Sequence, residues 1–463
     1  MQALHRFAAE SAVFDDQSLV SLAGLVPVMR LAEQTGLGEL LTQKVAISEP
    51  RIRSGAANAG PKLTTLIAGM CAGADSIDDV GVLRSGGMPK VFHQVYAPST
   101  VGTLLREFSF GHARQLESVL GVHLSRLCQR VDLLPGADRR AFVDIDSLLR
   151  PVYGYAKQGA SYGFTTISGK PVLRKGLSPL ATTISTDLSA PVIAGMRLRA
   201  GKAGSAKGAA RMVAQAIACA RGAGVSGEIL VRGDSTFGGR AVIAACRRGG
   251  ARFSLVLTKN RAVQRAIEAI GDDAWTAVKY PGAVQDPDTG AWISDAEVAE
   301  TSYTAFASGP EAVTARLIVR RVRDAARQDE LFPVWRYHPF FTDSTEPVVD
   351  ADLTHRRHAV IETVFADLID GPLAHMPSGR FGANSAWVLC AAITHNLLRA
   401  AGRLADPQLG RARGATLRRK IINIPARFTR PQRRPMLHLP THWPWARAWR
   451  QLWHATTTPL STA

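Results

Sequence analysis

The chain has 463 residues, of which 46% are hydrophobic and 20% are charged. This composition is typical of an ordered globular protein and excludes a disordered one, and the length exceeds what one compact core usually serves. The formal net charge of +18 predicts a polyanionic partner, because such an excess most often neutralises phosphates and releases their counterions. A surface kept basic only for solubility is the alternative.

Cysteine usage and apolar runs indicate the compartment. The five cysteines are scattered without CxxC spacing, which predicts buried, reduced thiols. The N-terminus has no basic segment followed by an apolar core, and no apolar run approaches the ~20 residues that span a bilayer. We therefore expect a cytoplasmic protein without a membrane partner.

The N-terminal segment, 1–135, is expected to be mostly helical. Apolar residues recur at helical spacing between Ser18 and Leu41, with interruptions at Gly36 and Gly38. Further helices are predicted over residues 61–72, from Ser99 or Thr100 onward, and over residues 113–131. Two interpretations stay open: a DNA-recognition domain of helix-turn-helix character, or an ordinary helical packing domain.

From Arg140 onward the pattern changes to strands that alternate with helices. Strands are predicted over residues 141–146, 163–167, 179–185, 192–199, 227–234 and 252–258, with helices over residues 209–221 and 239–248. A meander of antiparallel strands followed by alternating helices and strands is the order of an RNase H-like fold, so the predicted class is α/β.

Between Arg261 and Val319 the alternation stops. Turn residues and short strand-like segments predict a β-rich insertion there. The core then resumes with a strand over residues 332–341, a helix that contains Glu362, and an apolar helix over residues 384–399. From Arg403 to the end, twelve Arg or Lys residues stand against one acid, Asp406, so this basic tail carries about +11 of the +18.

Three acidic residues in distinctive contexts are the candidate catalytic groups. Asp146 and Asp234 each end a short apolar strand, and Glu362 lies in the late helix. Transfer at a phosphodiester needs a nucleophilic oxygen, a stabilised leaving oxygen and neutralised charge, all of which two Mg²⁺ ions provide. Carboxylates are the ligands that Mg²⁺ prefers. Asp144 lies on the same strand face as Asp146, and we prefer Asp146 as the ligand because it is nearer the strand end.

The stretch before Glu362 suggests phosphate contacts. His358 and His355 lie four and seven positions before Glu362 on one helical stripe, with Arg356 and Arg357 on neighbouring faces. Two histidines and a glutamate could also mimic a zinc site, but no third soft ligand is evident. We expect Asp367 and Asp370, further along the helix, to be solvated acids.

Taken together, these segments resemble the DDE transposases of bacterial insertion sequences, in the cut-and-paste group with a β-strand insertion before the last acid. The three acids are widely separated along the chain, at positions 146, 234 and 362, which is a plausible spacing. The matching stretches are residues 143–147, 153–155, 160–164, 197–201, 231–235, 355–362, 381–387 and 395–399.

The resemblance implies an RNase H-like catalytic core that depends on Mg²⁺ or Mn²⁺ and cleaves both strands at the element's inverted repeats. It also implies double-stranded DNA, at the ends and at the target, as partner, and a homodimer that cuts in trans. The implied organisation is a helical DNA-end-binding domain (1–135), a core in two parts (136–260 and 320–402), a β-rich insertion (261–319) and a basic tail (403–463). In that tail, DNA contacts are expected from Arg418, Arg419 and Lys420.

Relatives with the insertion pass through a DNA hairpin and stack a flipped base on an aromatic side chain of the insertion. Trp275 and Trp292 are the candidates here, and the alternative is that they fill the insertion's own core.

The sequence also departs from the family pattern. Leu148 stands where relatives often have Thr, His355 and His358 where they have Tyr and Arg, and Ile369 and Asp370 where a Lys or Arg is usual. Arg356 and Arg357 are the expected substitutes in gripping phosphate.

Two other functions stay open. One is a catalytically inactive or domesticated DNA-binding derivative, against which the presence of all three acids argues. The other is a metal-dependent nuclease that cuts without joining. A glycosidase-type carboxylate pair would leave the basic tail without a role.

Overall fold

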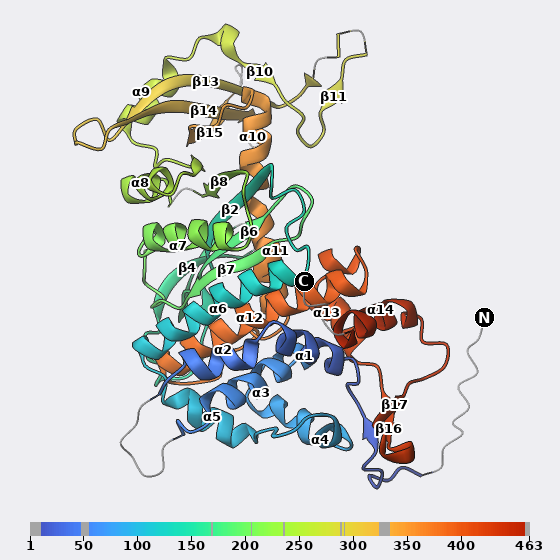
Figure 1. Cartoon of the computed structure of the whole chain (residues 1–463). Coiled ribbons are helices and arrows are strands. Elements are labelled where there is room, and N and C mark those ends of the chain that lie inside the picture. Colours follow the sequence, from blue (N-terminus) through green and yellow to red (C-terminus); the bar gives the residue numbers. More distant parts are fainter. Residues whose placement is uncertain are drawn as a thin grey trace.

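The chain forms a mixed α/β structure around one nine-stranded sheet, with helices packed at one end and a β-rich lobe at the other (Figure 1). The computed structural model describes residues 11–47, 55–167, 170–204, 206–234, 237–287, 289–290, 292–323 and 334–458. None of the helices in these ranges is long and apolar enough to cross a membrane.

Five strands form the part of the sheet that carries the candidate acids. They are β2 (Arg140–Ser147), β6 (Leu180–Ser185), β7 (Val192–Arg197), β8 (Glu228–Gly233) and β9 (Arg252–Leu255). On one side of β2, the strands β6 and β7 follow in an antiparallel meander. On the other side, β8 and β9 run parallel to β2. The inner strands are apolar and buried, as strands covered on both faces usually are.

Helices cover this part of the sheet. The connecting helices are α7 (Ala209–Gly222) and α8 (Arg240–Arg248), both close to their predicted starts. The helix α7 packs on β6 and β7, and α8 packs on α7 and β9. Helix α12 (Phe381–Ala405) packs on β7 and is buried from Ala383 to Gly402, so it forms the centre of the hydrophobic core.

The predicted insertion continues the central sheet instead of forming a separate one. Its strands are β10 (Thr276–Ala277), β13 (Ala296–Ala305) and β14 (Val313–Arg323), and they reach the core through β15 (Trp335–Thr342), which pairs with both β14 and β9. The short strands β11 (Val284–Gln285) and β12 (Trp292–Ile293) form a separate hairpin. The lobe begins with a helix, α9 (Arg261–Glu268), because the Asn260 side chain accepts hydrogen bonds from the amides of Ala262 and Val263 and caps it.

The N-terminal region is helical, with one exception. The helices are α1 (Leu25–Gln34), α2 (Leu37–Lys44), α3 (Ala59–Ala72), α4 (Met88–Val91), α5 (Pro98–Arg106) and α6 (Phe110–Arg130). The exception is β1 (Leu19–Val20), where the sequence predicts a helix. These two residues pair with β16 (Ala426–Thr429), near the opposite end of the chain, so a long-range contact overrides the local helical spacing.

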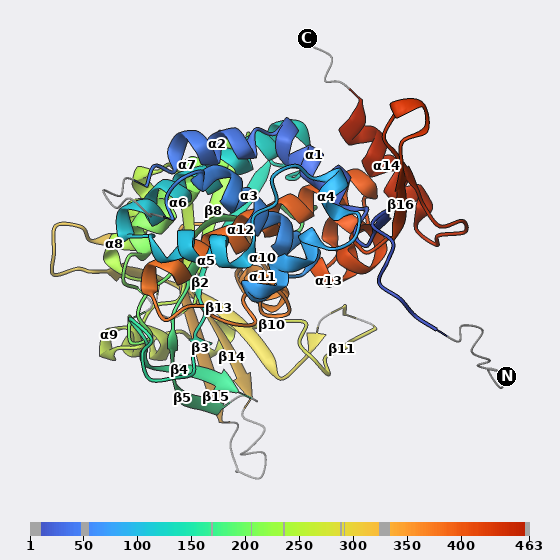
Figure 2. The ribbon, with the colours of Figure 1, turned by 90° about the horizontal axis from the view of Figure 1, so that it is seen from below.

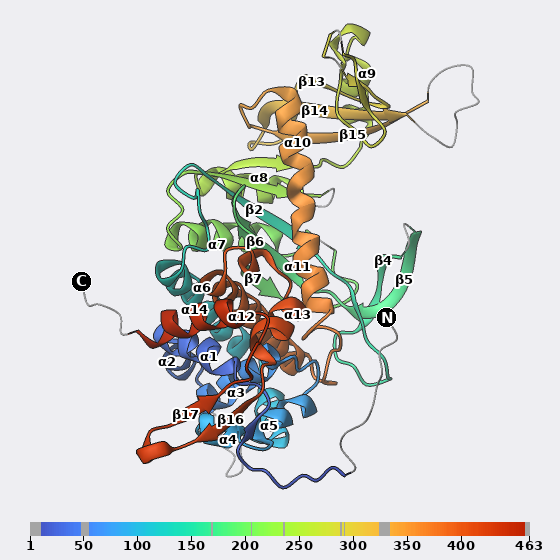
Figure 3. The same cartoon turned by 90° about the vertical axis from the view of Figure 1, so that its right-hand side faces the viewer.

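The basic segment after Arg403 is folded into this helical region. Its strands β16 and β17 (Met436–His438) form a hairpin, and its last helix, α14 (Ala446–Thr457), packs on α1 and α12. Ile421, Ile422, Trp449 and Leu452 are buried there. The hairpin projects from the helical end of the molecule (Figure 3). The apolar residues of the segment after Arg403 are therefore part of the core, whereas most of its basic residues lie at the surface.

A second small sheet stands apart from the main one. Among the strands that the structure describes, the hairpin of β4 (Ser161–Ile167) and β5 (Lys170–Leu177) pairs only with β3 (Arg150–Pro151). It projects away from the helices (Figures 2 and 3). The prediction that residues 163–167 belong to the core meander was therefore wrong. The side chains of Tyr162, Phe164 and Leu173 are exposed on the hairpin, so no burial requirement ties it to the sheet.

Candidate active site

The register of β2 and β8 brings the two strand-end aspartates next to each other. Ile145 of β2 is paired with Gly233 of β8, and Asp146 and Asp234 are the next residues along each strand. Because the strands are parallel, both carboxylates leave the sheet at the same edge. Phe237, a little further along the chain, is fully buried and anchors the turn into α8.

Glu362 reaches the same edge from a long, broken helix. Helix α10 (Val348–Arg356) is followed by a 3₁₀ turn (Arg357–Ala359) and then by α11 (Val360–Ile369), which packs against β2. Ile361, Val364, Phe365 and Leu368 form the buried face of α11, and Glu362 is on its exposed face.

The other two candidate acids act electrostatically on Asp146. Burial, together with the negative charges of Asp234 and Glu362, raises the pKa of Asp146 to about 7, and burial contributes most. Two groups oppose the rise: the backbone amide of Ser147, which donates a 2.6 Å hydrogen bond to Oδ1 of Asp146, and the guanidinium of Arg199. Repelling carboxylates around a partly buried acid favour a cation between them.

Arg199 is a site residue that the sequence analysis did not single out, although it lies in the matching stretch of residues 197–201. Its side chain is buried and donates hydrogen bonds to the carbonyl oxygens of Ser178, Gly204 and Lys207. Burial lowers the pKa of Arg199 to about 10, and the charge of Asp146 works against that lowering. Arg199 therefore places a fixed positive charge near Asp146.

Asp144, the second candidate on β2, is held in a buried ion pair. Its carboxylate accepts two hydrogen bonds from Arg232, from Nε at 2.7 Å and from Nη2 at 2.9 Å. Both side chains are almost fully buried, and the Arg232 guanidinium lies 4.0 Å from the centre of the Phe142 ring. Both oxygens of Asp144 are therefore occupied by Arg232, whereas Asp146 lies nearer the edge of the sheet.

The two histidines before Glu362 occupy different environments. His355 is only 6% exposed, stacks on Phe340 with ring centres 4.1 Å apart, and has Nδ1 2.9 Å from the hydroxyl of Ser254. Burial, with help from His358 and nearby arginines, lowers its pKa well below the ordinary value. The structure therefore does not place His355 to contact a DNA phosphate. His358 is half-buried, and its Nδ1 lies 2.7 Å from the carbonyl oxygen of His355.

The two arginines of this stretch are each paired with an acid. Arg356 lies 2.9 Å from the buried carboxylate of Asp352, whereas Arg357 lies 3.3 Å from Asp187 at the surface. An exposed pair of the second kind contributes little stability, so Arg357 can exchange its partner for a phosphate.

The acids Asp367 and Asp370 differ from each other as well. Asp370 is exposed and 3.2 Å from Arg413, in line with the expectation of a solvated acid. Asp367 is nearly buried, 3.2 Å from Nδ1 of the buried His395 and 3.6 Å from Arg399. The expectation that Asp367 is solvated was therefore wrong, because α12 and the Gly414 amide cover this turn of the helix.

A cavity of about 630 Å³ opens beside Asp234, between the sheet, the lobe and α10. Its walls combine aromatic and apolar groups with cationic ones. Its basic members are Lys259, Arg320, His338, His355, Arg356 and His358, and its acidic members are Asp234 and Asp352.

The two tryptophans of the lobe are not equivalent. Trp275 packs beside Tyr337, with ring centres 6.1 Å apart, and under the guanidinium of Arg321 at 4.2 Å. It therefore belongs to the lobe's own packing. Trp292 lies on the small β11–β12 hairpin, half-buried, with the Lys279 ammonium 5.5 Å from its ring.

The three basic residues expected to contact DNA from the C-terminal segment also differ. Arg419 is exposed, and Lys420 is half-buried with its ammonium 5.7 Å from the Trp445 ring. The Arg418 side chain lies against Gly73 and Gly371, between the end of α3 and the end of α11. Arg418 therefore packs between elements, and Arg419 is the most accessible of the three.

The donor set fits a hard divalent cation. Asp146, Asp234 and Glu362 supply only carboxylate oxygens, and their mutual repulsion is relieved by positive charge. Within the described ranges, no three His, Cys, Asp or Glu side chains already converge on one metal position. Asp146, Asp234 and Glu362 are therefore the candidate ligands for such a cation.

Two strand-end aspartates and a late helical glutamate at one edge of a mixed sheet are the arrangement expected of a DDE-type transposase, an enzyme that cleaves DNA, and the family comparison shows that class. Residues 9–458 match the family described as "Transposase DDE domain group 1", so the chain belongs to that family. Among solved structures, the chain is similar to the piggyBac transposase synaptic complex with hairpin DNA, at 10% identity and a TM-score of 0.42, over 85% of this chain and 79% of that chain. No curated protein matches the sequence.

Proposed function

We propose that this transposase cleaves and joins DNA at the inverted repeats of its own mobile element by two-metal phosphoryl transfer. Asp146, Asp234 and Glu362 would hold the ions, Mg²⁺ or Mn²⁺. The observation that carries the proposal is the parallel register of β2 and β8, which brings Asp146 and Asp234 together at the edge of the sheet beside α11, the helix of Glu362. Bound ions would supply the activated nucleophile and neutralise the charge that develops at phosphorus.

The order of the strands supports an RNase H-like core. An antiparallel meander (β2, β6, β7) is followed by two strands (β8, β9) that are parallel to β2 and joined through helices. In this arrangement the first two acids lie on adjacent central strands, and rigid strands hold them better than loops would.

Backbone and side-chain groups of this protein would perform three tasks at the site. The Ser147 amide orients the Asp146 carboxylate through its hydrogen bond. The buried guanidinium of Arg199 limits the build-up of negative charge around Asp146 before a cation binds. The cationic wall of the cavity beside Asp234 provides phosphate contacts on either side of the reacting bond.

DNA contacts away from the site would come from the helical region and from the hairpin of β16 and β17. Between those strands, Arg430, Arg433 and Arg434 are all exposed. The hairpin is anchored to the N-terminal region by pairing with β1, so we interpret both as one DNA-end-binding unit. A homodimer in the DNA complex, which the family resemblance implies, belongs to this proposal.

We extend the proposal to a hairpin route, in which a flipped base stacks on an aromatic side chain of the lobe. Trp292 suits this role better than Trp275, because it is on a small projecting hairpin and does not belong to the lobe's packed core. Stacking a base on an indole is worth about 1–3 kcal/mol, enough to hold an unpaired base.

The test is cleavage of a duplex that carries the element's terminal repeats, with the wild type and with Asp146→Ala, Asp234→Ala and Glu362→Ala. Each variant should lose cleavage in Mg²⁺ and keep DNA binding, because it lacks a metal ligand but no phosphate contact. Asp144→Ala is unsuitable as a control since it leaves Arg232 buried without its partner. Asp370→Ala is suitable because this acid lies on the surface at the end of the same helix.

The outcomes separate the alternatives. Cleavage without strand joining would indicate a nuclease, and binding without cleavage by the wild type would indicate an inactive derivative. Robust Mg²⁺-dependent cleavage by Asp234→Ala would refute the assignment of the acids.

A further inference from the structure

A single buried arginine connects the two catalytic strands to the helix that carries the third acid. Arg232 is two positions before Asp234 on β8, and its partner Asp144 is two positions before Asp146 on β2. Because residues two apart in a strand share a face, the Asp144–Arg232 ion pair and the two catalytic aspartates lie on the same face of the sheet. Arg232 is 1% exposed.

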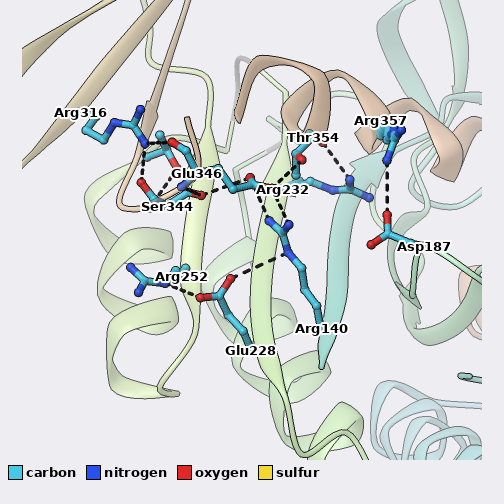
Figure 4. A network of polar contacts seen from close by, with 11 residues as sticks. Arg140, Asp187, Glu228, Arg232, Arg252, Arg316, Ser344, Glu346, Thr354 and Arg357 are labelled. Atoms are coloured by element: carbon cyan, nitrogen blue, oxygen red, sulfur yellow. Dashed lines mark hydrogen bonds and ion pairs between the residues drawn. The ribbon is translucent and has the colours of Figure 1, made fainter. Parts of the chain in front are cut away.

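The remaining donor of Arg232 leaves the sheet. Its Nη1 donates a 2.9 Å hydrogen bond to the backbone carbonyl of Thr354, near the end of α10 (Figure 4). The guanidinium thereby makes three directed hydrogen bonds, two to the carboxylate on β2 and one to the helix. Its planar fork is suited to this, and a lysine ammonium cannot reproduce it.

The Thr354 carbonyl lies just before the point where the helix type changes. Two residues later α10 ends and the 3₁₀ turn Arg357–Ala359 begins, and Glu362 lies in the first turn of α11. The next carbonyl, that of His355, accepts a hydrogen bond from the His358 ring, whose Nδ1 must carry the proton because a carbonyl only accepts. Side chains that bond to carbonyls at this point hold the chain where the hydrogen-bond pattern of the helix changes.

The break is also attached to the neighbouring strands. The His355 ring stacks on Phe340 of β15 and lies 2.9 Å from the Ser254 hydroxyl of β9. The Thr354 hydroxyl donates to Glu346, which accepts in turn from Arg140 at the start of β2 (Figure 4). Among these contacts, only the Arg232 side chain bonds both to the backbone of α10 and to β2, the strand of Asp146.

From these contacts we infer that Arg232 is a positioning residue. Together with Asp144, it fixes the turn before Glu362 relative to Asp146 and Asp234, and so keeps the three carboxylates at the spacing that a divalent cation requires. The inference rests on the proposed function, because it assigns those three acids as the metal ligands.

The test compares Arg232→Lys with the wild type and with Arg197→Lys. Arg197 forms a similar two-bond pair with Glu117, at 2.9 Å for each bond, but this pair connects β7 to α6 and lies outside the turn before Glu362. Binding of MnCl₂ to each full-length protein is measured by calorimetry in the absence of DNA. The Mg²⁺ concentration for half-maximal cleavage is measured separately, and circular dichroism and thermal melting confirm folding.

We expect Arg232→Lys to bind Mn²⁺ about 10- to 100-fold more weakly, as is common when a residue that supports the metal ligands is changed. The Mg²⁺ requirement should rise in parallel, while metal-free DNA binding stays unchanged. Arg197→Lys should lose stability without a change in metal affinity. Wild-type Mn²⁺ affinity in a folded Arg232→Lys protein would overturn the inference.

A second variant covers the case in which the single change prevents folding. The double change Asp144→Leu with Arg232→Met replaces the ion pair by apolar side chains of similar volume, which proteins often tolerate. It removes the bond to Thr354, so its Mn²⁺ affinity should fall as in Arg232→Lys. Wild-type affinity in the double variant, or failure of both variants to fold, would overturn the inference. Because Mn²⁺ binding is measured without DNA, the comparison decides this point even if the wild type proves unable to cleave.

Discussion

The carboxylate of Asp367 lies 3.2 Å from Nδ1 of His395, which ties α11, the helix of Glu362, to the buried helix α12. Burial lowers the pKa of His395, so the neutral ring donates from Nδ1 to Asp367, and its Nε2 accepts from Arg399 at 3.4 Å. Burial alone would raise the pKa of Asp367. The hydrogen bond from His395, the nearby Arg399 charge and the Gly414 amide outweigh that effect and lower the pKa to about 2.

Asp367→Asn should therefore destabilise the protein by about 2 kcal/mol at neutral pH. Because the pKa is lower in the folded state than in the unfolded state, this contribution is present above about pH 4 and is lost as the pH falls towards 2. Urea unfolding of wild type and variant at pH 7 and in acid measures it. The exposed Asp370→Asn is the matched control, and an equal loss of stability in both variants would show that the Asp367 pair contributes nothing.

Asp146→Asn should stabilise the metal-free protein at alkaline pH. The pKa of Asp146 is raised to about 7 in the folded state, so this group favours folding fully below about pH 4, and that contribution is lost as the pH rises through 7. An Asn side chain avoids the loss, and its oxygen can still accept from the Ser147 amide. In EDTA, the variant should exceed the wild type by on the order of a few kcal/mol at pH 8 and match it at pH 4.

Mg²⁺ supplies the control for that comparison. A cation bound by the three acids should raise the melting temperature of the wild type at pH 8 more than that of Asp146→Asn. If the wild type melts no lower than the variant at pH 8 in EDTA, the pKa of Asp146 is not raised in the folded protein.

The double variant Arg433→Gln/Arg434→Gln removes two arginines from the hairpin of β16 and β17. Its DNA binding should be less sensitive to salt than that of the wild type. Both side chains are exposed between β16 and β17. If each contacts a phosphate, the slope of log K against log salt should become shallower by roughly 1.8. Arg247→Gln with Arg248→Gln, at the end of α8, changes the net charge equally and should leave the slope unchanged.

Point substitutions suit this test better than deletion of the basic segment. Truncation near Arg403 would remove Trp449 and Leu452 from the core and expose the surfaces of α1 and α12 that they cover. Loss of DNA binding after such a truncation would then report unfolding. In the comparison of the two double variants, equal slopes of log K against log salt would exclude the hairpin as a phosphate-binding element.

The two tryptophans of the lobe should behave differently. Trp292→Ala should slow formation of a DNA hairpin more than the first nick, because only the hairpin needs a base held out of the stack, at a cost of roughly a few kcal/mol. Trp275→Ala should slow both steps and lower the melting temperature, since it removes packing against Tyr337 and Arg321. Denaturing gels separate nicked from hairpin products. If Trp292→Ala left both steps unchanged, either another residue would hold the base or no hairpin would form.

The local pattern of the sequence identified the elements with strong periodicity. The strands around Asp146 and Asp234 and the helices α7, α8 and α12 follow from apolar runs and their turn residues, because burial of these runs dominates their free energy. The three candidate acids could also be selected from the sequence, since each stands in a motif typical of the family. Their proximity could not, because long stretches of chain separate positions 146, 234 and 362.

Tertiary structure decided the features that depend on distant partners. Leu19 and Val20 form a strand only because β16 lies beside them, and the basic segment is part of the core only because α1 and α12 present an apolar surface to it. His355 and Asp367 look like surface groups in the sequence, yet neighbouring elements bury both of them. Burial and ion pairing are properties of surroundings that the chain assembles from separate segments, so one local stretch cannot specify them.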